Sequence, residues 1–427
     1  MPVDMDSQSV RLTDFKLRAY RSCKSASFSP DARVTALIGP NGSGKTNILQ
    51  GLMLLYGTGR EYAGFLGDDL FTLESQVSAT FLFGKKHVRL RASITYRPSD
   101  QNRDEVLYSQ EEWNFKEMTG SDEWIALPPH YDKRRAFLRY RRDGRARFVH
   151  GYVRGPRGSR VRHLFVPERQ LPPRAWQALE AVHDFQSRTV YYSASQFTDP
   201  TQCPPSFEID EDGDLYEQGA SSSRSPDHLR FIYQLYRMHK MQENLYATYM
   251  SLVDRKGLNL IQKIKWKETK YSTRAYEVRA GSVITKSRKR LLIIPTVYIG
   301  DSQLSFAQLS EGTFRTLAIL FYVVTDKSRL LLIEEPEVCV HHGLLTSVID
   351  IIREFAREKQ IIFSTHSENV LDQLEPEQVR LVSKGKGGTI VSTISRNMSK
   401  RQFQALKEYL QTKGSLGEYW RHSGFSE

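Results

Sequence analysis

The stretch Gly39-Pro40-Asn41-Gly42-Ser43-Gly44-Lys45-Thr46 decides the fold, because it matches G-x-x-x-x-G-K-[ST] at every fixed position. The apolar run 34–38 before it predicts a buried strand, and the apolar-rich segment 47–56 after it predicts a helix. Glycines in such a turn let backbone N–H groups converge on a phosphate, and the helix N-terminus adds positive potential there. A chance glycine turn would not explain both flanking elements, so the stretch predicts a nucleotide site.

Each residue type in this stretch has an expected role. Lys45 reaches the β- and γ-phosphates, and the hydroxyl of Thr46 ligates Mg²⁺. The turn before them lines the phosphates with Asn41, Gly42, Ser43 and Gly44.

Two carboxylates end a second strand-like run. Leu330-Leu331-Leu332-Ile333 is followed directly by Glu334-Glu335-Pro336-Glu337. An acidic helix start would explain this run alone, but the phosphate loop earlier in the chain favours a catalytic pair. The spacing favours Glu334 as the acid on the Mg²⁺ side and Glu335 as the general base that activates water.

Two further turns carry polar residues suited to phosphate. Leu309-Ser310-Glu311-Gly312-Thr313 precedes an apolar helix, so Ser310 and Gly312 form either a helix cap or a second anion-binding turn. In a head-to-tail pair of chains, Ser310 of one chain would clamp the γ-phosphate held by Lys45 of the other. His366 ends the strand-like run 361–365, where it would hydrogen-bond the γ-phosphate and sense its loss.

Composition predicts a globular cytoplasmic protein with no membrane segment. The 427 residues are 39% hydrophobic and 26% charged, and length alone predicts about two or three domains. No apolar run approaches the roughly 20 residues of a membrane helix, and the polar start Met1–Val10 is no signal peptide. Three scattered cysteines form no disulfide framework or zinc motif, as in a reducing compartment.

The net charge of +12 favours an anionic partner. Residues 133–162 hold twelve Lys/Arg and one acid, Asp143. This region is either a solvated basic hairpin or a contact for a nucleic-acid backbone, and no base-reading motif decides between them.

Hydrophobic periodicity predicts the other elements. The expected strands are 10–24, 76–83, 87–96, 190–192 and 291–299; the expected helices are 172–185 and one long helix, 227–253. The segment 200–225 is expected to be a flexible acidic loop, and 256–290 a set of basic strand edges. Helix–strand alternation over 304–394 predicts a sheet covered by helices.

The ordered set of motifs resembles the ABC-type ATPases of the SMC, RecF and OLD class. Walker A corresponds to 39–46, the signature to 309–313, Walker B to 330–335 and the switch histidine to His366. The strings Glu334–Glu337, Leu309–Thr313 and Gly417–Trp420 are most similar to OLD-like stand-alone ATPases of antiphage systems, such as PtuA- or AriA-like proteins. The resemblance covers roughly residues 10–100 and 290–425.

This resemblance implies a fold, a domain division and partners. The fold is an α/β ABC-type P-loop ATPase head, a mixed sheet with flanking helices, with an inserted helical and β lobe. The head is formed by 1–100 and 291–427, and the insertion is 101–290. ATP and Mg²⁺ are the cofactors. Heads pair as a homodimer or higher homo-oligomer around sandwiched ATP, and the chain controls a separate effector, a nuclease, in antiviral defence.

Three further site residues rest on the resemblance alone. Arg21 and Ser22 are expected at the adenine or α-phosphate end of the nucleotide. A Q-loop glutamine is expected at Mg²⁺ and the attacking water, with Gln196 as the candidate and Gln76 as its rival.

The sequence departs from the class at several points. Glu334 replaces the commoner Asp, and His342 stands where a proline is common. No cluster of Toprim acids follows His366, and no heptad coiled coil is present.

The alternative functions are a RecF-like DNA-repair ATPase that binds duplex DNA through Lys133–Arg162, a transporter ATPase subunit, and a nuclease using the acids of 208–212.

Overall fold

The structure is a computed structural model. It describes residues 10–55, 75–84, 88–98, 106–117, 123–126, 135–140, 146–147, 173–193, 197, 199–210, 227–279, 282–325, 327–338, 340, 342–356, 359–412 and 414–423.

These residues divide into two compact units that interleave in sequence. The first is drawn from Met1–Tyr192, Lys327–Glu335 and Ile352–Glu427, and the second from Ser193–Asp326 and Pro336–Ile351. The sequence-based division cuts the chain at 100 and 290 instead, so the described residues between 106 and 192, predicted as insertion, lie in the first unit.

A six-stranded sheet positions the phosphate loop in the first unit. Its order is β10 (Thr189–Ser193), β15 (Leu330–Glu334), β16 (Gln360–Thr365), β3 (Val34–Ile38), β17 (Val379–Gly385) and β18 (Gly388–Thr393). Strands β15, β16, β3 and β17 run parallel, and β18 is antiparallel to β17. Their near-continuous apolar sequences are typical of strands buried on both faces, and all five residues of β3 are buried.

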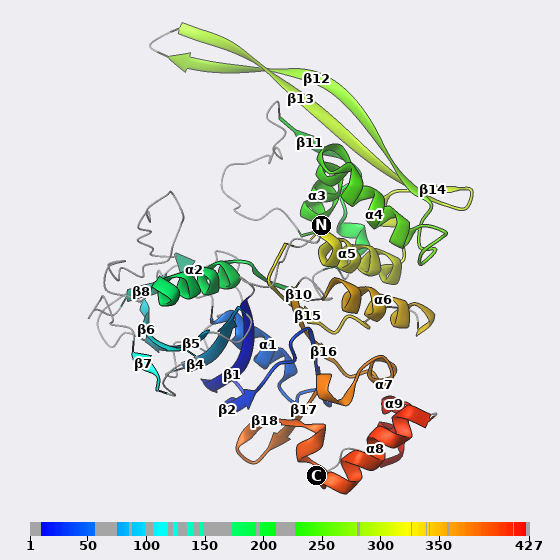
Figure 1. The fold of residues 1–427 in the computed structure, drawn as a ribbon. Helices are drawn as coiled ribbons and strands as arrows, with labels where there is room; N and C mark the ends of the chain where they lie inside the picture. The colour runs from blue at the N-terminus through cyan, green and yellow to red at the C-terminus, as the bar shows by residue number, and fades with distance from the viewer. Residues whose placement is uncertain are drawn as a thin grey trace. The chain divides into compact units, whose positions relative to one another are not determined.

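A second, antiparallel sheet completes the first unit. Its path is β2 (Cys23–Phe28), β1 (Val10–Tyr20), β4 (Ser75–Phe83), β5 (Val88–Pro98), β6 (Val106–Glu117), β8 (Arg135–Tyr140) and β9 (Ala146–Arg147), with β7 (Ile125–Ala126) on β6. Helix α1 (Lys45–Met53) contacts strands of both sheets, so one apolar core joins them (Figure 1). The other helices are α2 (Pro173–Ser187), α7 (Glu368–Leu371), α8 (Lys400–Thr412) and α9 (Leu416–Ser423).

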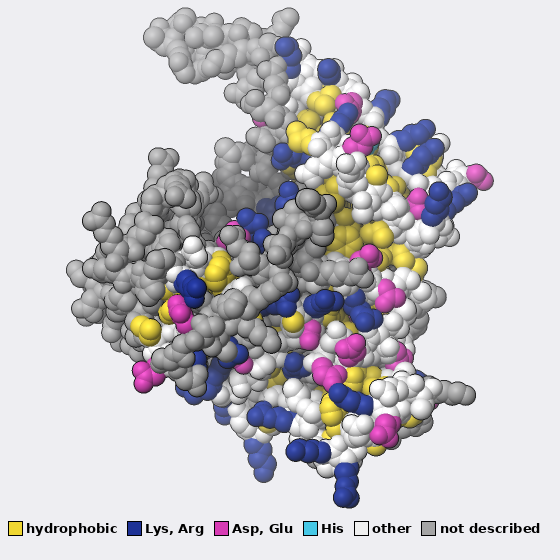
Figure 2. Space-filling view, viewed as in Figure 1, with side chains coloured by type: hydrophobic (Ala, Val, Ile, Leu, Met, Phe, Trp, Pro, Cys, Tyr) yellow, Lys and Arg dark blue, Asp and Glu magenta, His cyan; other side chains and the backbone are white. Residues whose placement is uncertain are grey.

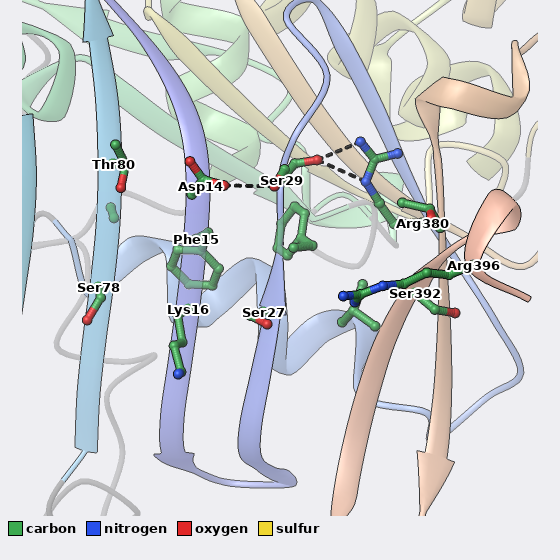
Figure 3. Close-up of a pocket in the computed structure, with 14 residues that line it drawn as sticks. Asp14, Phe15, Lys16, Ser27, Ser29, Ser78, Thr80, Arg380, Ser392 and Arg396 are labelled. Carbon is green, nitrogen blue, oxygen red and sulfur yellow. Dashed lines mark hydrogen bonds between the residues drawn. The ribbon is translucent and has the colours of Figure 1, made fainter. Parts of the chain in front are cut away.

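A buried arginine ties the two sheets together beside a hollow of about 440 Å³. Arg380 of β17 donates to the carbonyl of Ser29 through Nε at 2.9 Å and through a terminal nitrogen at 2.5 Å (Figure 3). The Ser29 hydroxyl in turn donates to Asp14 at 2.8 Å. Arg380 therefore fixes the end of β2 against β17.

The second unit packs helices against a β-ribbon. The helices are α3 (Asp227–Met241), α4 (Glu243–Val253) and α5 (Glu311–Thr325), and α6 (His342–Phe355) leads back to the first unit. The sheet order is β11 (Phe207–Ile209), β13 (Ser282–Ile299), β12 (Lys263–Arg279), with β14 (Ser302–Leu304) on β13. Aromatic rings of α3 and α5 form its core; Phe231, for example, lies 5.6 Å from Phe314.

Several sequence predictions need correction. The strand expected over 10–24 is a hairpin, because the chain reverses after Tyr20. The single helix expected over 227–253 is two helices, broken at Gln242, because α4 turns to bury Tyr249, whose hydroxyl donates to Leu317 O at 3.0 Å. The loop expected over 200–225 contains the strand β11, and the strand 291–299 is the second half of the longer β13. The strands expected over 76–83 and 87–96 are confirmed as β4 and β5, and the structure pairs them antiparallel.

Candidate functional site

The phosphate loop joins β3 to α1. Gly42 has φ +76° and Gly44 has φ +106°, left-handed backbone that glycine adopts without steric cost. A Cβ on Gly39 would lie 2.0 Å from Val382 O, so this glycine is needed for close approach to β17. The glycines of the loop are therefore required by its backbone: Gly42 and Gly44 adopt positive φ, and Gly39 lies too close to β17 for a side chain.

Lys45 is held inside the loop. Its Nζ donates to Gly39 O at 2.8 Å and to Pro40 O at 3.1 Å, and the residue is only 5% exposed. The loop carbonyls thus fix the ammonium at the start of α1, where the helix N-terminus also favours an anion.

The outer side of the loop is braced by Thr389, at the start of β18. Its hydroxyl donates to Ser43 O at 3.0 Å and lies 2.8 Å from Ser22 Oγ. A Cβ on Gly44 would approach this hydroxyl to 2.1 Å, which shows how closely the brace packs. Asn47 of α1 donates to Ser22 Oγ at 2.7 Å. One hydrogen-bond network therefore joins the phosphate loop, helix α1, the β1–β2 hairpin and the β17–β18 hairpin.

Glu334 ends β15 with both carboxylate oxygens hydrogen-bonded. The Thr46 hydroxyl donates to Oε1, and the Tyr191 hydroxyl donates to Oε2 at 2.5 Å. These residues lie in the same unit, on α1, β15 and β10. Tyr191 is buried and fixes the plane of the carboxylate.

The donor chemistry here fits Mg²⁺. The ion prefers hard oxygen ligands and is usually held by one or two protein groups together with phosphate oxygens and waters. Thr46 and Glu334 supply two such groups side by side. No group of three or more His, Cys, Asp or Glu side chains in the described part of the chain could hold a metal by itself.

Glu335 lies at the same edge of the sheet in strained backbone. Its φ is +46°, uncommon for a residue with a side chain, and its N–H donates to Ser364 O at 3.1 Å. Oε1 of Glu335 lies 3.7 Å from Nδ1 of His366. Both side chains are partly exposed, so water can reach them.

Arg21 and Ser22 form the β1–β2 turn beside α1. Arg21 has φ +50°, donates to Gln50 Oε1 of α1 and lies over the Tyr20 ring at 5.4 Å. The turn therefore lies at the outer end of the phosphate loop.

Other predicted residues lie elsewhere. Ser310 and Gly312 belong to the second unit, where Ser310 caps α5: its Oγ accepts from Thr313 N at 3.2 Å and its carbonyl accepts from Phe314 N at 2.9 Å. Gln76 lies in β4, whereas Gln196 lies outside the described residues. Most of Lys133–Arg162 and the side chain of His342 also lie outside them.

Sequence reasoning missed Tyr191 and Thr389. Tyr191 meets Glu334 across 143 positions of sequence, and Thr389 meets Ser43 across 346. The only available signal for Tyr191 was its place in the predicted strand 190–192.

Comparison with protein families gives two overlapping matches to one model, AAA_21, described as "AAA domain, putative AbiEii toxin, Type IV TA system", over residues 34–124 and 119–372. The chain belongs to this family. The matched residues include the phosphate loop, the Glu334-Glu335 pair and His366. This AAA domain is therefore a nucleotide-binding ATPase domain, and the predicted fold class, an α/β P-loop ATPase head with a mixed sheet and flanking helices, is confirmed.

Solved structures similar to this AAA domain include heads of SMC proteins. One, described as the "SmcHead bound to the C-winged helix domain of ScpA", is 13% identical, with a TM-score of 0.41 over 92% of this chain and 99% of that one. The SMC head domain from Thermotoga maritima is 12% identical, with a TM-score of 0.37 over 90% and 98%. An Smc head from Pyrococcus furiosus with an extended coiled coil, bound to the C-terminal domain of ScpA, is 13% identical, with a TM-score of 0.42 over 94% and 100%.

A search of curated proteins finds no match to this AAA domain. Within the described residues, no helix is both long and apolar enough to span a bilayer.

Proposed function

We propose that this chain binds ATP with Mg²⁺ and hydrolyses the ATP to ADP and phosphate. The observation that carries the proposal is the meeting of Thr46 with Glu334 at the end of β15, with Glu335 and His366 at the same edge. The phosphate loop, an oxygen-donor pair and a carboxylate with a histidine are the parts that ATP hydrolysis requires.

Each residue then has a role. Lys45 and the loop N–H groups bind the β- and γ-phosphates, while Thr46 and Glu334 hold Mg²⁺, which neutralises phosphate charge when bound. Glu335 accepts a proton from a water molecule while the oxygen of that water attacks the γ-phosphorus. The bond between the γ-phosphorus and the bridging oxygen of the β-phosphate then breaks, which gives ADP and phosphate. His366, 3.7 Å from Glu335 Oε1, orients this carboxylate and responds to loss of the γ-phosphate. Arg21 and Ser22 border the opposite end of the nucleotide.

A second copy of the chain would complete the site. Ser310 is exposed at the start of the 15-residue helix α5, and its turn offers a hydroxyl and a helix N-terminus to an anion. In the proposed dimer, Ser310 and Gly312 of one chain bind the γ-phosphate held by Lys45 of the other. A Q-loop role for Gln196 belongs to the same proposal.

The biological role we propose is that of an OLD-like ATPase in antiviral defence. ATP binding and hydrolysis would hold and release a separate effector, a nuclease. The resemblance in the strings Glu334–Glu337 and Leu309–Thr313 supports this role. The family description also names a toxin of a toxin–antitoxin system, which is another setting where a harmful activity is kept under control.

The test uses Glu335→Gln with Glu354→Gln as a matched control, because Glu354 is an exposed carboxylate of α6. We expect Glu335→Gln to lower the ATPase rate at least about 100-fold, as for loss of a general base, while retaining ATP and forming a dimer by native mass measurement. Glu354→Gln should match the parent protein. Wild-type hydrolysis by Glu335→Gln would refute the base role, and an ATP-saturated monomer would refute the dimer.

A RecF-like repair ATPase is the second candidate, favoured by the basic composition of Lys133–Arg162. Cells expressing the chain with its neighbouring genes separate the two: protection from phage that is lost with Lys45→Ala supports defence. Sensitivity of a deletion strain to DNA damage without any effect on phage supports repair.

A further inference from the structure

The ribbon of β12 and β13 is the longest hairpin among the described residues of the second unit. Its register is unbroken from Lys263↔Tyr298 to Arg279↔Ser282. Residues 263–299 hold ten Lys/Arg and two Glu. The sequence had suggested only strand edges here, and the ATPase roles proposed above use none of these residues.

One face of the ribbon base is committed to packing. Ile264, Ile293 and Val297 are buried there. The ring of Trp266 lies 5.4 Å from that of Tyr236 on α3. Because side chains alternate along a strand, Lys263, Lys265 and Lys267 project from the other face.

That second face is cationic. Lys263, Lys265 and Lys267 are exposed, and none of the three forms an ion pair with any side chain that the structure describes. The Nζ atoms of Lys263 and Lys265 each lie 4.9 Å from the centre of the Tyr298 ring, which directs both ammonium groups over one aromatic platform. Figure 2 shows Lys and Arg side chains where the described part of the ribbon meets its grey part.

Two acids near the ribbon base are paired with cations other than these lysines. Glu268, on the packed face, pairs with Lys240 of α3 at 2.5 Å. Glu208 of β11 pairs with Arg290 at 3.1 Å. The lysine row therefore keeps its positive charge for a partner outside the chain.

We propose that this face of the β12–β13 ribbon, with Lys263, Lys265, Lys267 and Tyr298 at its base, is a docking surface for double-stranded DNA. Lysines two positions apart on a strand are about 6.7 Å apart, close to the rise along the helix axis, about 6.8 Å, that separates a phosphate of B-DNA from the next but one on the same strand. A two-stranded ribbon also fits the major groove of B-DNA, whereas the major groove of A-form RNA is too narrow for it. An acidic protein would offer charge without this regular spacing.

The test measures binding of the full chain to a fluorescent 30-base-pair DNA duplex by anisotropy, at several salt concentrations. The variant is Lys263→Gln/Lys265→Gln/Lys267→Gln. The matched control is Lys256→Gln/Lys327→Gln/Lys400→Gln, which removes the same charge from exposed lysines elsewhere. We expect the ribbon variant to bind at least about 10-fold more weakly and to lower the salt slope by about 2 to 3, since each lost phosphate contact contributes about 0.9.

The remaining outcomes are decisive. The control triple should keep parental affinity, and both triples should keep the parental melting temperature and basal ATPase rate. Equal weakening in both triples, or no binding by the parent, overturns the proposal. Competition by double-stranded RNA or poly-glutamate as strong as by DNA at equal charge also overturns it. The surface would then be a general anion or acidic-protein site. None of these outcomes depends on whether Glu335 is the catalytic base.

Discussion

The hydroxyl of Tyr191 lies 2.5 Å from Oε2 of Glu334, the carboxylate whose other oxygen accepts from Thr46. One buried tyrosine on β10 thus orients the acid that we assign to Mg²⁺. Groups behind a metal ligand set its orientation and commonly change metal affinity or activity by about 10- to 100-fold when removed.

Tyr191→Phe should therefore raise the Mg²⁺ concentration needed for half-maximal ATPase activity by about 10-fold, with activity recovering at high Mg²⁺. The control is Tyr409→Phe on α8, which removes another tyrosine hydroxyl that donates to a glutamate, Glu418 of α9, at 2.9 Å. A Mg²⁺ titration of ATPase rate checks both variants. An unchanged titration for Tyr191→Phe would remove the positioning role.

Gly44→Ala and Gly42→Ala should differ in stability, although both place alanine at positive φ. Such backbone costs an alanine about 1 to 2 kcal/mol. A Cβ at Gly42 meets nothing within 4 Å, whereas at Gly44 it would lie 2.1 Å from Thr389 Oγ1. We expect Gly44→Ala to lower the free energy of unfolding, measured in urea, by about 1 to 3 kcal/mol more than Gly42→Ala does. We also expect Gly44→Ala to abolish nucleotide binding. Equal stability of the two variants would mean that Thr389 does not brace the loop.

Arg380→Ala should lower the free energy of unfolding by about 2 to 3 kcal/mol, because it leaves buried carbonyls without a donor. Arg380 donates to the carbonyls of Ser29, Glu377 and Val379. Burial lowers the pKa of this guanidinium, which still stays charged at neutral pH. Arg380→Lys should restore only part of the loss, since one ammonium cannot span all three carbonyls. Arg396→Ala, at the exposed rim of the same hollow, is the control and should be nearly neutral. Urea midpoints that are equal for Arg380→Ala and the control would contradict this.

Acid should weaken the second unit through His228. Burial lowers the pKa of His228 from 6.5, and the nearby carboxylates of Asp227 and Asp199 offset this only in part. Because the unfolded chain then binds a proton more readily than the folded chain, stability falls as pH drops below about 6.5 and levels off below the folded-state pKa. His228→Phe keeps a ring against Phe314, which lies 5.3 Å away and stacked. Its urea midpoint should change less between pH 7.5 and 5.5 than that of the parent, and an equal change would show that other groups cause the acid effect.

The features that the sequence could predict are those whose interacting residues lie close together along the chain. The phosphate loop and the Glu334-Glu335 pair are local patterns, in which neighbouring residues carry both the backbone signal and the chemistry. The antiparallel pair β4 and β5 is equally local, since β4 ends at Phe83 and β5 begins at Val88.

The missed features have distant causes. Gln242 carries no helix-breaking signal, and α3 ends there because Tyr249 must reach Leu317 on α5. Tyr191 and Thr389 gain their roles only from partners on other strands. The strand β11 is three residues long and exists because β13 offers an edge beside it.

The order of the central strands has a consequence for synthesis on the ribosome. Strand β3, at residues 34–38, pairs with β16 at 360–365 and β17 at 379–385. Neither neighbour exists until most of the polypeptide has been translated. The nascent phosphate loop must therefore wait, with an apolar strand unpaired, while the whole second unit emerges and folds. The strand order therefore leaves an aggregation-prone apolar segment exposed during synthesis, and we expect chaperones to bind it there.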